Sequence, residues 1–297
     1  MNTLTTTFGA YIKDAMRLTR SSTVITEDNV YQEAAEDIRP YLDKMVETLI
    51  LPGSGVDGME NLEKLYSLAK EGKSCLLLPE HYSNMDLSLL TYLADMEGER
   101  GKKISRSIIA IAGMKLNEDN PVVSAFASAY SRIVIYPSRS YQSLDGENAK
   151  AEILRANAIN RAAMKAVIRV KYKGHLILIF PSGTRYRPGD PSTKRGVREI
   201  DSYIRSFDYM CLVAINGQVL HVRPGDMMDD EVSNDVVRLS FSPVIDCGEF
   251  RDRIRAEEDA KGTSDNDDKK QAVADAIMAE LEEMHIKGEE NRKKFLF

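Results

Sequence analysis

The chain has 297 residues, of which 43% are hydrophobic and 29% are charged, so it can bury one large core or two smaller ones. These proportions exclude an intrinsically disordered chain and a fibrous repeat. The formal net charge of −6 excludes a protein that binds nucleic acid with its whole surface. Any basic residues must therefore act locally.

The cysteines and the N-terminal segment bear on the compartment. Cys75, Cys211 and Cys247 are too few and too scattered for a disulfide framework or a zinc site, which favours a reducing compartment. No run approaches the roughly 18 apolar residues that cross a bilayer, and the first 30 residues lack the apolar centre of a secretory signal. We expect a cytoplasmic protein, with peripheral membrane contact left open. The Ser- and Thr-rich residues 1–22 also leave the plastid stroma open.

Residues 1–72 have a helical pattern and are expected to form a small N-terminal helical domain. Thr26 should open the second of its helices, and Pro40 should kink or split that helix. The three predicted helices cover 4–20, 27–50 and 59–72.

From residue 73 onward, short apolar runs alternate with helical stretches, which is the pattern of an α/β domain. The strand candidates are 74–78, 107–112, 132–136, 175–180, 210–215 and 236–241. The helical candidates are 85–96, 120–130, 147–172, 197–206 and 268–290. We therefore expect residues 73–297 to form a mixed, largely parallel central sheet flanked by helices.

His81 and Asp86 follow directly on the apolar run 75–78. A histidine at a strand end and a carboxylate one helical turn later can converge. Asp86 would then fix the imidazole tautomer while His81 takes a proton from an alcohol. The spacing alone is a weak indication, because an aspartate can fall five positions after a histidine by chance. The alternative is that Asp86 caps the next helix beside a surface histidine.

The segment 180–190, FPSGTRYRPGD, follows the most apolar strand candidate. Arg185 and Arg187 alternate along an extended chain and so project to one side, where two guanidinium groups could hold a phosphate. Gly183 would let the backbone approach a ligand closely, and Thr184 is assigned to the same phosphate site. The alternative is a solvated basic turn.

Arg139 follows another strand candidate, 132–136. If the sheet is parallel, the ends of this strand and of the strands before His81 and Phe180 lie at one edge, where α/β sheets usually bind ligands. Arg139 would then join the phosphate site. Otherwise it is an exposed loop residue.

These blocks, in this order and spacing, resemble those of the glycerolipid acyltransferases. The family's first block is Asn-His-X-Ser-X-X-Asp, and residues 80–86 match it except at Glu80. The third block, Phe-Pro-Glu-Gly-Thr-Arg, is matched with Ser182 in place of the glutamate. Ser182 and the Arg-X-Arg-Pro run at 185–188 are most similar to the soluble plastid glycerol-3-phosphate 1-acyltransferases. The second block, Gly-X-X-Phe-X-X-Arg, is poorly kept, which leaves the role of Arg139 open.

The resemblance spans about residues 58–216 and implies direct transfer without an acyl-enzyme. His81 would deprotonate the 1-hydroxyl of glycerol 3-phosphate with Asp86 as its partner, and the alkoxide would attack a thioester. The arginines named above would hold the phosphate. The second substrate would be acyl-CoA or acyl carrier protein, and neither a cofactor nor a metal is implied.

Both acyl donors carry negative charge, and one helical candidate, 147–172, has a basic face. Arg161, Lys165 and Arg169 lie at four-residue intervals there and could dock either donor. A solvated helix face explains the same pattern equally well.

Three other functions compete with this interpretation. An enzyme that acylates lysophosphatidate at position 2 should carry a strongly apolar or basic membrane anchor, and the helix at 4–20 is only moderately amphipathic. A noncatalytic lipid-binding relative would not need to keep His81. The run from Gly53 to Gly58 satisfies the dinucleotide-binding pattern G-X-G-X-X-G, but a helical segment precedes it and Pro52 interrupts it.

Overall fold

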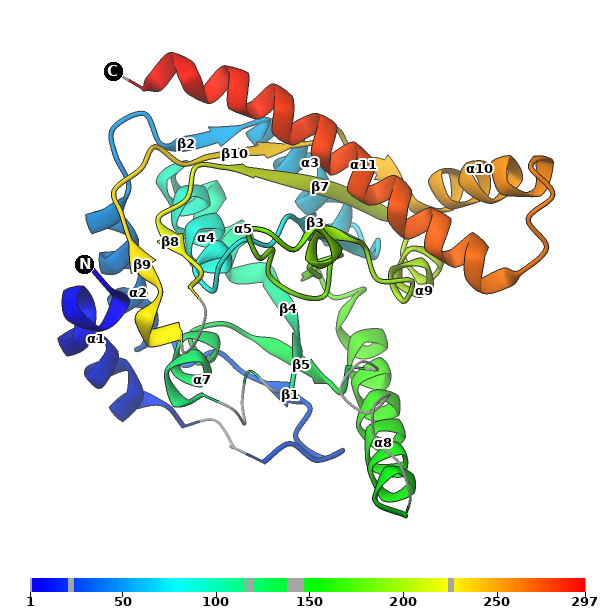
Figure 1. Cartoon of the computed structure of the whole chain (residues 1–297), viewed down its shortest axis with the longest axis horizontal. Coiled ribbons are helices and arrows are strands. Elements are labelled where there is room, and N and C mark those ends of the chain that lie inside the picture. The colour runs from blue at the N-terminus through cyan, green and yellow to red at the C-terminus, as the bar shows by residue number, and fades with distance from the viewer. Residues whose placement is uncertain are drawn as a thin grey trace.

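The structure is a computed structural model that describes residues 2–20, 24–114, 116, 120–137, 147–223 and 227–296. Within these ranges one nine-stranded sheet has the order β1-β5-β4-β6-β3-β7-β10-β2, with β11 also paired to β7 (Figure 1). Its strands are β1 (Tyr31–Gln32), β2 (Gly55–Asp57), β3 (Cys75–Pro79), β4 (Ile108–Gly113), β5 (Arg132–Ile135), β6 (Leu176–Leu178), β7 (Tyr209–Asn216), β10 (Arg238–Phe241) and β11 (Ile245–Asp246). Two further strands, β8 (Leu220–His221) and β9 (Glu231–Val232), pair with each other.

The five central strands, β5, β4, β6, β3 and β7, are parallel to their neighbours. Parallel strands are buried on both faces, which is why they read as continuous apolar runs in the sequence. Towards the edges, β1 is antiparallel to β5, while β10 is antiparallel to β7 and parallel to β2. The predicted mixed, largely parallel sheet is confirmed.

Helices cover both faces of this sheet. On one face pack α1 (Leu4–Leu18), α2 (Arg39–Leu49), α3 (Met59–Lys70), α4 (Asp86–Met96), α5 (Glu99–Ser107) and α7 (Pro121–Ser128). On the other pack α8 (Glu147–Val170), α9 (Ile200–Ser206), α10 (Cys247–Ala260) and α11 (Asn266–Arg292). The molecule therefore has three layers, helix, sheet and helix.

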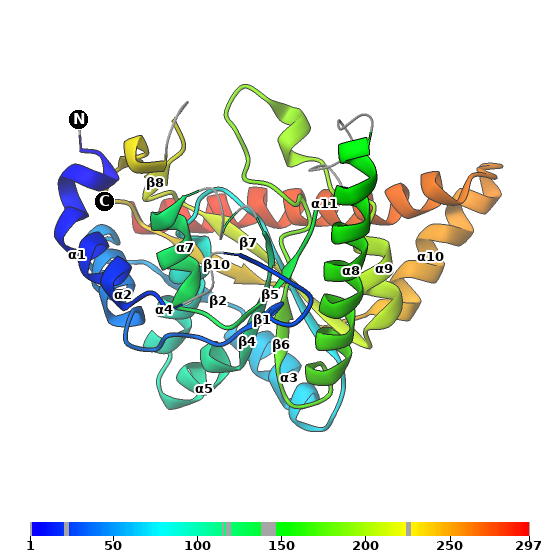
Figure 2. The same cartoon turned by 90° about the horizontal axis from the view of Figure 1, so that it is seen from below.

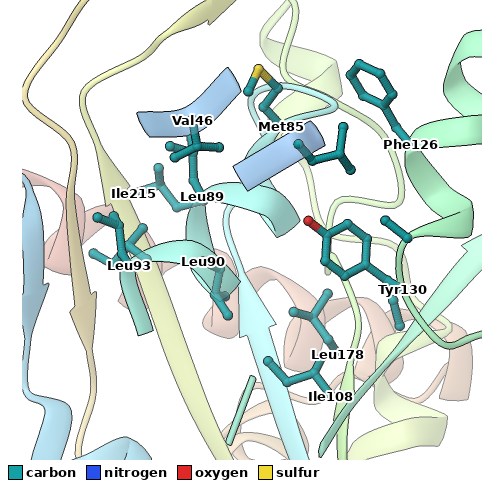
Figure 3. Close-up of a cluster of buried hydrophobic side chains, with 14 of the residues drawn as sticks. Val46, Met85, Leu89, Leu90, Leu93, Ile108, Phe126, Tyr130, Leu178 and Ile215 are labelled. Carbon is teal, nitrogen blue, oxygen red and sulfur yellow. The ribbon is translucent and has the colours of Figure 1, made fainter. Parts of the chain in front are cut away.

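Alternate residues of β3 enter the two cores. Cys75 and Leu77 belong to the first core cluster, and Leu76 and Leu78 belong to the second. In the first cluster, side chains from α4 meet side chains from β4, β6 and β7, as Figure 3 shows for Leu89, Leu90, Leu93, Ile108, Leu178 and Ile215. The two-residue period of the strand thus joins both helical layers to one sheet.

The second predicted helix, 27–50, is wrong in its first part. Residues 27–38 form turns and β1, and α2 begins only at Arg39 with Pro40 in its first turn. A proline at that position loses no intrahelical hydrogen bond, so Pro40 starts the helix and does not kink it. Residues 1–72 also supply β1 and β2 to the sheet, and neither strand was predicted.

The run from Gly53 to Gly58 does not form a dinucleotide-binding turn. The chain arrives from α2 and not from a strand, and Gly55–Asp57 is itself the edge strand β2. Gly58, at φ 77°, starts α3, and a Cβ atom there would lie 2.6 Å from the carbonyl oxygen of Phe241. Gly55 and Gly58 allow close packing against β10, and the structure contradicts the dinucleotide-binding alternative.

Because the five central strands are parallel, their carboxyl ends share one edge of the sheet. The loop after β6 lies at the top of Figure 2, and β8 lies near it, while α3 and α5 lie at the opposite end. His81 follows β3 at this carboxyl edge, Phe180 follows β6, and Pro137 follows β5.

Candidate active site

His81 and Asp86 are hydrogen bonded, with Nδ1 of the histidine 2.9 Å from Oδ2 of the aspartate. Asp86 is the first residue of α4, where the positive end of the helix dipole stabilises a carboxylate. Only 3% of its side chain is exposed, against 16% for His81.

Further donors surround the Asp86 carboxylate. The backbone N–H of Tyr82 donates to Oδ2 at 2.6 Å, and that of Ser83 contacts both oxygens at 2.9 and 3.0 Å. The Ser83 hydroxyl donates to Oδ1 at 2.8 Å. These donors compensate a buried negative charge. Since an ionised carboxylate can only accept, the His81 ring must carry its proton on Nδ1, which leaves the Nε2 lone pair available as a base.

The loop after β6 contacts both the ring and the backbone of His81. Phe180 stacks on the His81 ring with centroids 3.8 Å apart and an interplanar angle of 16°. The backbone N–H of Tyr186 donates to the carbonyl oxygen of His81 at 2.8 Å. The parallel sheet therefore brings two of the predicted blocks into direct contact.

His81 lines two cavities, one on each face of the sheet. The larger, of about 410 Å³, lies beside α8 and α9 and is lined by Ile111, Ile135, Ala163, Met164, Ile179 and Tyr203 among others. The smaller, of about 100 Å³, lies beside α4 and α7 and is lined by Leu87, Val123, Phe126 and Arg132 among others. Both are lined mainly by apolar side chains, and His81 lies between them.

Arg132 gives the smaller cavity a buried charge. Its side chain is 1% exposed, and burial lowers the pKa of Arg132 to about 10. Nη1 donates to the Ala127 carbonyl oxygen at 3.0 Å, at the C-terminal end of α7, where a cation is favourable. Its Nε has no hydrogen-bond partner among the described residues.

The predicted phosphate residues lie in the loop that contacts His81, but their environments differ. Gly183 has φ 64°, and a Cβ there would lie 3.1 Å from Val197, so glycine fits this position best. Ser182, where the family pattern has glutamate, is buried and donates to the Thr184 carbonyl oxygen at 2.7 Å, inside the loop. Thr184 is half-buried.

The two arginines of this loop are not equivalent. Arg185 is 26% exposed, and its Nη1 lies 3.4 Å from Oδ2 of Asp230, whose side chain is 1% exposed. Arg187 is exposed and, within the described part of the chain, forms no ion pair. Arg139, the third predicted arginine, lies outside the described residues.

The basic residues predicted on the long helix all belong to α8. Arg161, Lys165 and Arg169 are exposed, and none forms an ion pair with a described residue. Large apolar side chains are exposed on the same helix, with Leu154 at 70% and Ile168 at 55%.

The sequence did not predict that Glu80, Tyr82 and His285 also meet beside His81. Glu80 Oε2 lies 2.8 Å from Nδ1 of His285, on α11, and Glu80 Oε1 accepts from the Tyr82 hydroxyl at 2.8 Å. The unusual glutamate at position 80 was the only visible indication, because no local pattern singles out His285.

A family model described as Acyltransferase matches residues 55–215, which is more than half of the chain. The chain belongs to the Acyltransferase family. The matched region of this acyltransferase contains His81, Asp86 and the loop with Arg185. The resemblance seen in the sequence is thereby confirmed at the level of the acyltransferase family.

A crystal structure of the 1-acyl-sn-glycerophosphate acyltransferase PlsC from Thermotoga maritima is similar to this acyltransferase. The two share 16% sequence identity at a TM-score of 0.43, over 93% of this chain and 88% of that chain. At this level the two chains differ too much for the substrate of one to indicate that of the other. No curated protein matches the sequence significantly. Among the described helices, none is both long and apolar enough to cross a bilayer.

Proposed function

We propose that this acyltransferase moves a fatty acyl group from acyl-CoA or acyl carrier protein to the 1-hydroxyl of glycerol 3-phosphate, giving lysophosphatidate. The observation that carries the proposal is the His81–Asp86 pair, which stands beside an apolar cavity of about 410 Å³ and is joined to an arginine-bearing loop. The sequence likeness of Ser182 and of residues 185–188 to the plastid-type enzymes supports glycerol 3-phosphate as the acceptor.

In the proposed reaction, His81 Nε2 takes the proton of the acceptor hydroxyl while Asp86 stabilises the charge that forms on the ring. The hydroxyl oxygen attacks the thioester carbonyl carbon, and the carbon–sulfur bond then breaks. His81 returns its proton to the leaving thiolate. The ester and the free thiol leave, and the pair is restored for another turnover.

We place the acyl chain in the larger cavity. Its volume lies within the range of about 300–1,000 Å³ that is typical of small-molecule sites. The smaller cavity offers only about 100 Å³, and the Arg132 guanidinium in its wall, whose Nε has no hydrogen-bond partner among the described residues, makes it a less favourable environment for hydrocarbon.

We assign the phosphate to Arg185, Arg187, Gly183 and Thr184, with Arg139 as a further candidate. Arg187 is exposed and unpaired among the described residues, so it can bind an anion without breaking an existing ion pair. Arg185 would exchange or share its contact with Asp230 when the phosphate arrives. A doubly charged phosphate can accept two hydrogen bonds from one guanidinium. It can therefore compete with the Asp230 carboxylate, which lies 3.4 Å from Arg185 Nη1.

We further propose that the exposed face of α8 docks the anionic acyl donor through Arg161, Lys165 and Arg169. Replacing all three by glutamine should raise the KM for the donor and weaken its dependence on salt, with the KM for glycerol 3-phosphate unchanged. The matched control removes three exposed cations from α5, on the other face of the sheet: Lys102, Lys103 and Arg106. Equal effects of the two triple variants would contradict a docking role for α8.

We propose the cytoplasm as the compartment, with the plastid stroma as the alternative. Cys75, Cys211 and Cys247 are buried free thiols, which supports a reducing environment.

The deciding experiment is turnover of labelled glycerol 3-phosphate by the purified protein with acyl-CoA and with acyl carrier protein, compared with His81→Ala. Lysophosphatidate is tested in parallel as the acceptor. Faster turnover of lysophosphatidate would indicate a 2-acyltransferase instead. Activity that survives His81→Ala would contradict the proposed mechanism.

A further inference from the structure

The residue before the catalytic histidine is a buried carboxylate. Glu80 is 4% exposed, and its two oxygens accept three hydrogen bonds at 2.8 Å. The donors are the Tyr82 hydroxyl, the backbone N–H of Ile215 on β7, and Nδ1 of His285 on α11. Glu80 therefore joins the His81 segment to a central strand and to the C-terminal helix, which lies outside the region matched by the family model.

Tyr82 carries this connection to the catalytic pair. Its hydroxyl donates to Glu80, and its backbone N–H donates to Oδ2 of Asp86 at 2.6 Å. The same Asp86 oxygen accepts from His81 Nδ1. A chain of hydrogen bonds thus runs from His285 through Glu80 and Tyr82 to Asp86 and His81.

The far end of this chain is held firmly. The Asn216 side chain donates to the His285 carbonyl oxygen at 2.9 Å. A Cβ atom at Gly288, one turn later on α11, would lie 2.1 Å from Oδ1 of Asn216, so helix and strand are in close contact there. The helix cannot shift along β7 without breaking these contacts, which makes it a rigid support.

A second link joins α11 to the loop that carries the arginines. Lys194 pairs with Glu282 of α11 at 2.6 Å. Its Nζ also lies 5.9 Å from the ring centroid of Tyr82 and 5.5 Å from that of Tyr186. Both loops that meet at His81 are therefore fixed to the same helix.

Three charged groups face His285: Glu80, Glu282 and Lys194. Burial lowers the pKa of His285, but the hydrogen bond and negative charge of Glu80 outweigh it, so the pKa of His285 is raised from its ordinary value. When protonated, His285 balances the Glu80 carboxylate, which would otherwise be an uncompensated buried charge beside the site.

We propose that Glu80 and His285 are positioning residues that hold the His81–Asp86 pair in its reactive geometry through Tyr82. Neither side chain lines the two cavities at His81, so neither is placed to touch substrate. Where the family pattern has a neutral asparagine, this chain has a carboxylate, and α11 supplies the basic partner that a buried carboxylate needs. The proposal rests on the proposed function, in which His81 is the base.

The experiment measures kcat, both KM values and the His81 imidazole ¹⁵N resonances of the purified full chain. His285→Gln should lower kcat about ten- to a hundredfold, because a displacement of about 1 Å at a reacting group has that effect, and both KM values should stay within about twofold. Glu80→Gln combined with His285→Gln should recover most of the loss, since the isosteric amide needs no cationic partner. Lys287→Gln, at an exposed position of α11, is the matched control.

Tyr82→Phe removes one hydroxyl and tests the same link if His285→Gln does not fold. Unchanged kcat in both variants, or a loss that appears wholly in KM, overturns the proposal. The His81 ¹⁵N resonances are measured without substrate, so they test the positioning role independently of the proposed function. In the wild type they should report a proton on Nδ1, and in His285→Gln a mixture of tautomers. An unchanged tautomer in both His285→Gln and Tyr82→Phe overturns the positioning role even if glycerol 3-phosphate is not the substrate.

Discussion

The ring of His81 stacks on the ring of Phe180, with centroids 3.8 Å apart, although the two residues follow different strands. With Asp86 bonded to Nδ1, this contact fixes both the plane and the rotation of the imidazole. The base is thus oriented before substrate arrives, which lowers the entropic cost of the reactive geometry.

Phe180→Ala should therefore lower kcat about tenfold or more, because it frees the imidazole to rotate about its hydrogen bond to Asp86. Phe180→Tyr, which keeps the ring, should retain most of the activity. Steady-state kinetics of the two variants checks this. Equal losses of kcat in both variants would contradict a role for the stacked ring in orienting His81.

Asp86→Asn should lower kcat about 10²- to 10⁴-fold, because the amide cannot support a positive imidazole and disturbs the tautomer. Some loss of stability is also expected, since Tyr82 and Ser83 donate to both carboxylate oxygens and an amide has only one acceptor. Thermal unfolding of the variant, measured beside kcat, separates the two effects. A folded variant with nearly normal kcat would argue against His81 as the base.

Arg187→Ala should raise the KM for glycerol 3-phosphate roughly tenfold or more, because a hydrogen bond to a charged group contributes about 1.5–3 kcal/mol. The KM for the acyl donor should change little. Arg195→Ala is the control, because Arg195 is an exposed arginine of the same loop that pairs with Asp275 of α11. If Arg195→Ala raises this KM as much as Arg187→Ala, the phosphate assignment is incorrect.

Ala163→Leu should shift the chain-length preference to shorter acyl groups. Ala163 is 1% exposed and lines the larger cavity, so a bulkier side chain there occupies space that we assign to the hydrocarbon. The measurement is kcat/KM for a series of acyl donors from short to long. Val123→Phe, in the smaller cavity, should leave the preference unchanged, and a shift in that variant alone would place the chain there.

The stabilisation from His285 should depend on pH. The folded-state pKa of His285 is raised above the unfolded value of about 6.5. Its contribution is therefore fully present below about pH 6.5 and is lost as the pH rises through the raised pKa. The Tm of the wild type should exceed that of His285→Gln by more at pH 6 than at pH 9. Thermal unfolding at the two pH values measures this, and a pH-independent gap would contradict a charged His285.

Most of the central sheet could be predicted because its signals are local. β3, β4, β5, β6, β7 and β10 each lie within an apolar run of the sequence, and all six were predicted close to their observed positions. The short strands β1 and β2 carry no such run, and α5 and α10 have too few apolar residues to stand out. Pro40 was misread because a proline can kink a helix or begin one, and the sequence does not distinguish the two.

The sequence by itself determined the family and the five-residue separation of His81 and Asp86, because both depend on neighbours along the chain. Only the tertiary structure decided which distant side chains complete the site. Asp230 pairs with Arg185, and Phe180 stacks on the His81 ring. His285 is hydrogen bonded to Glu80, 205 positions away in the sequence. Such pairs are set by how strands and helices pack against one another, and side-chain period and propensity contain no record of that packing.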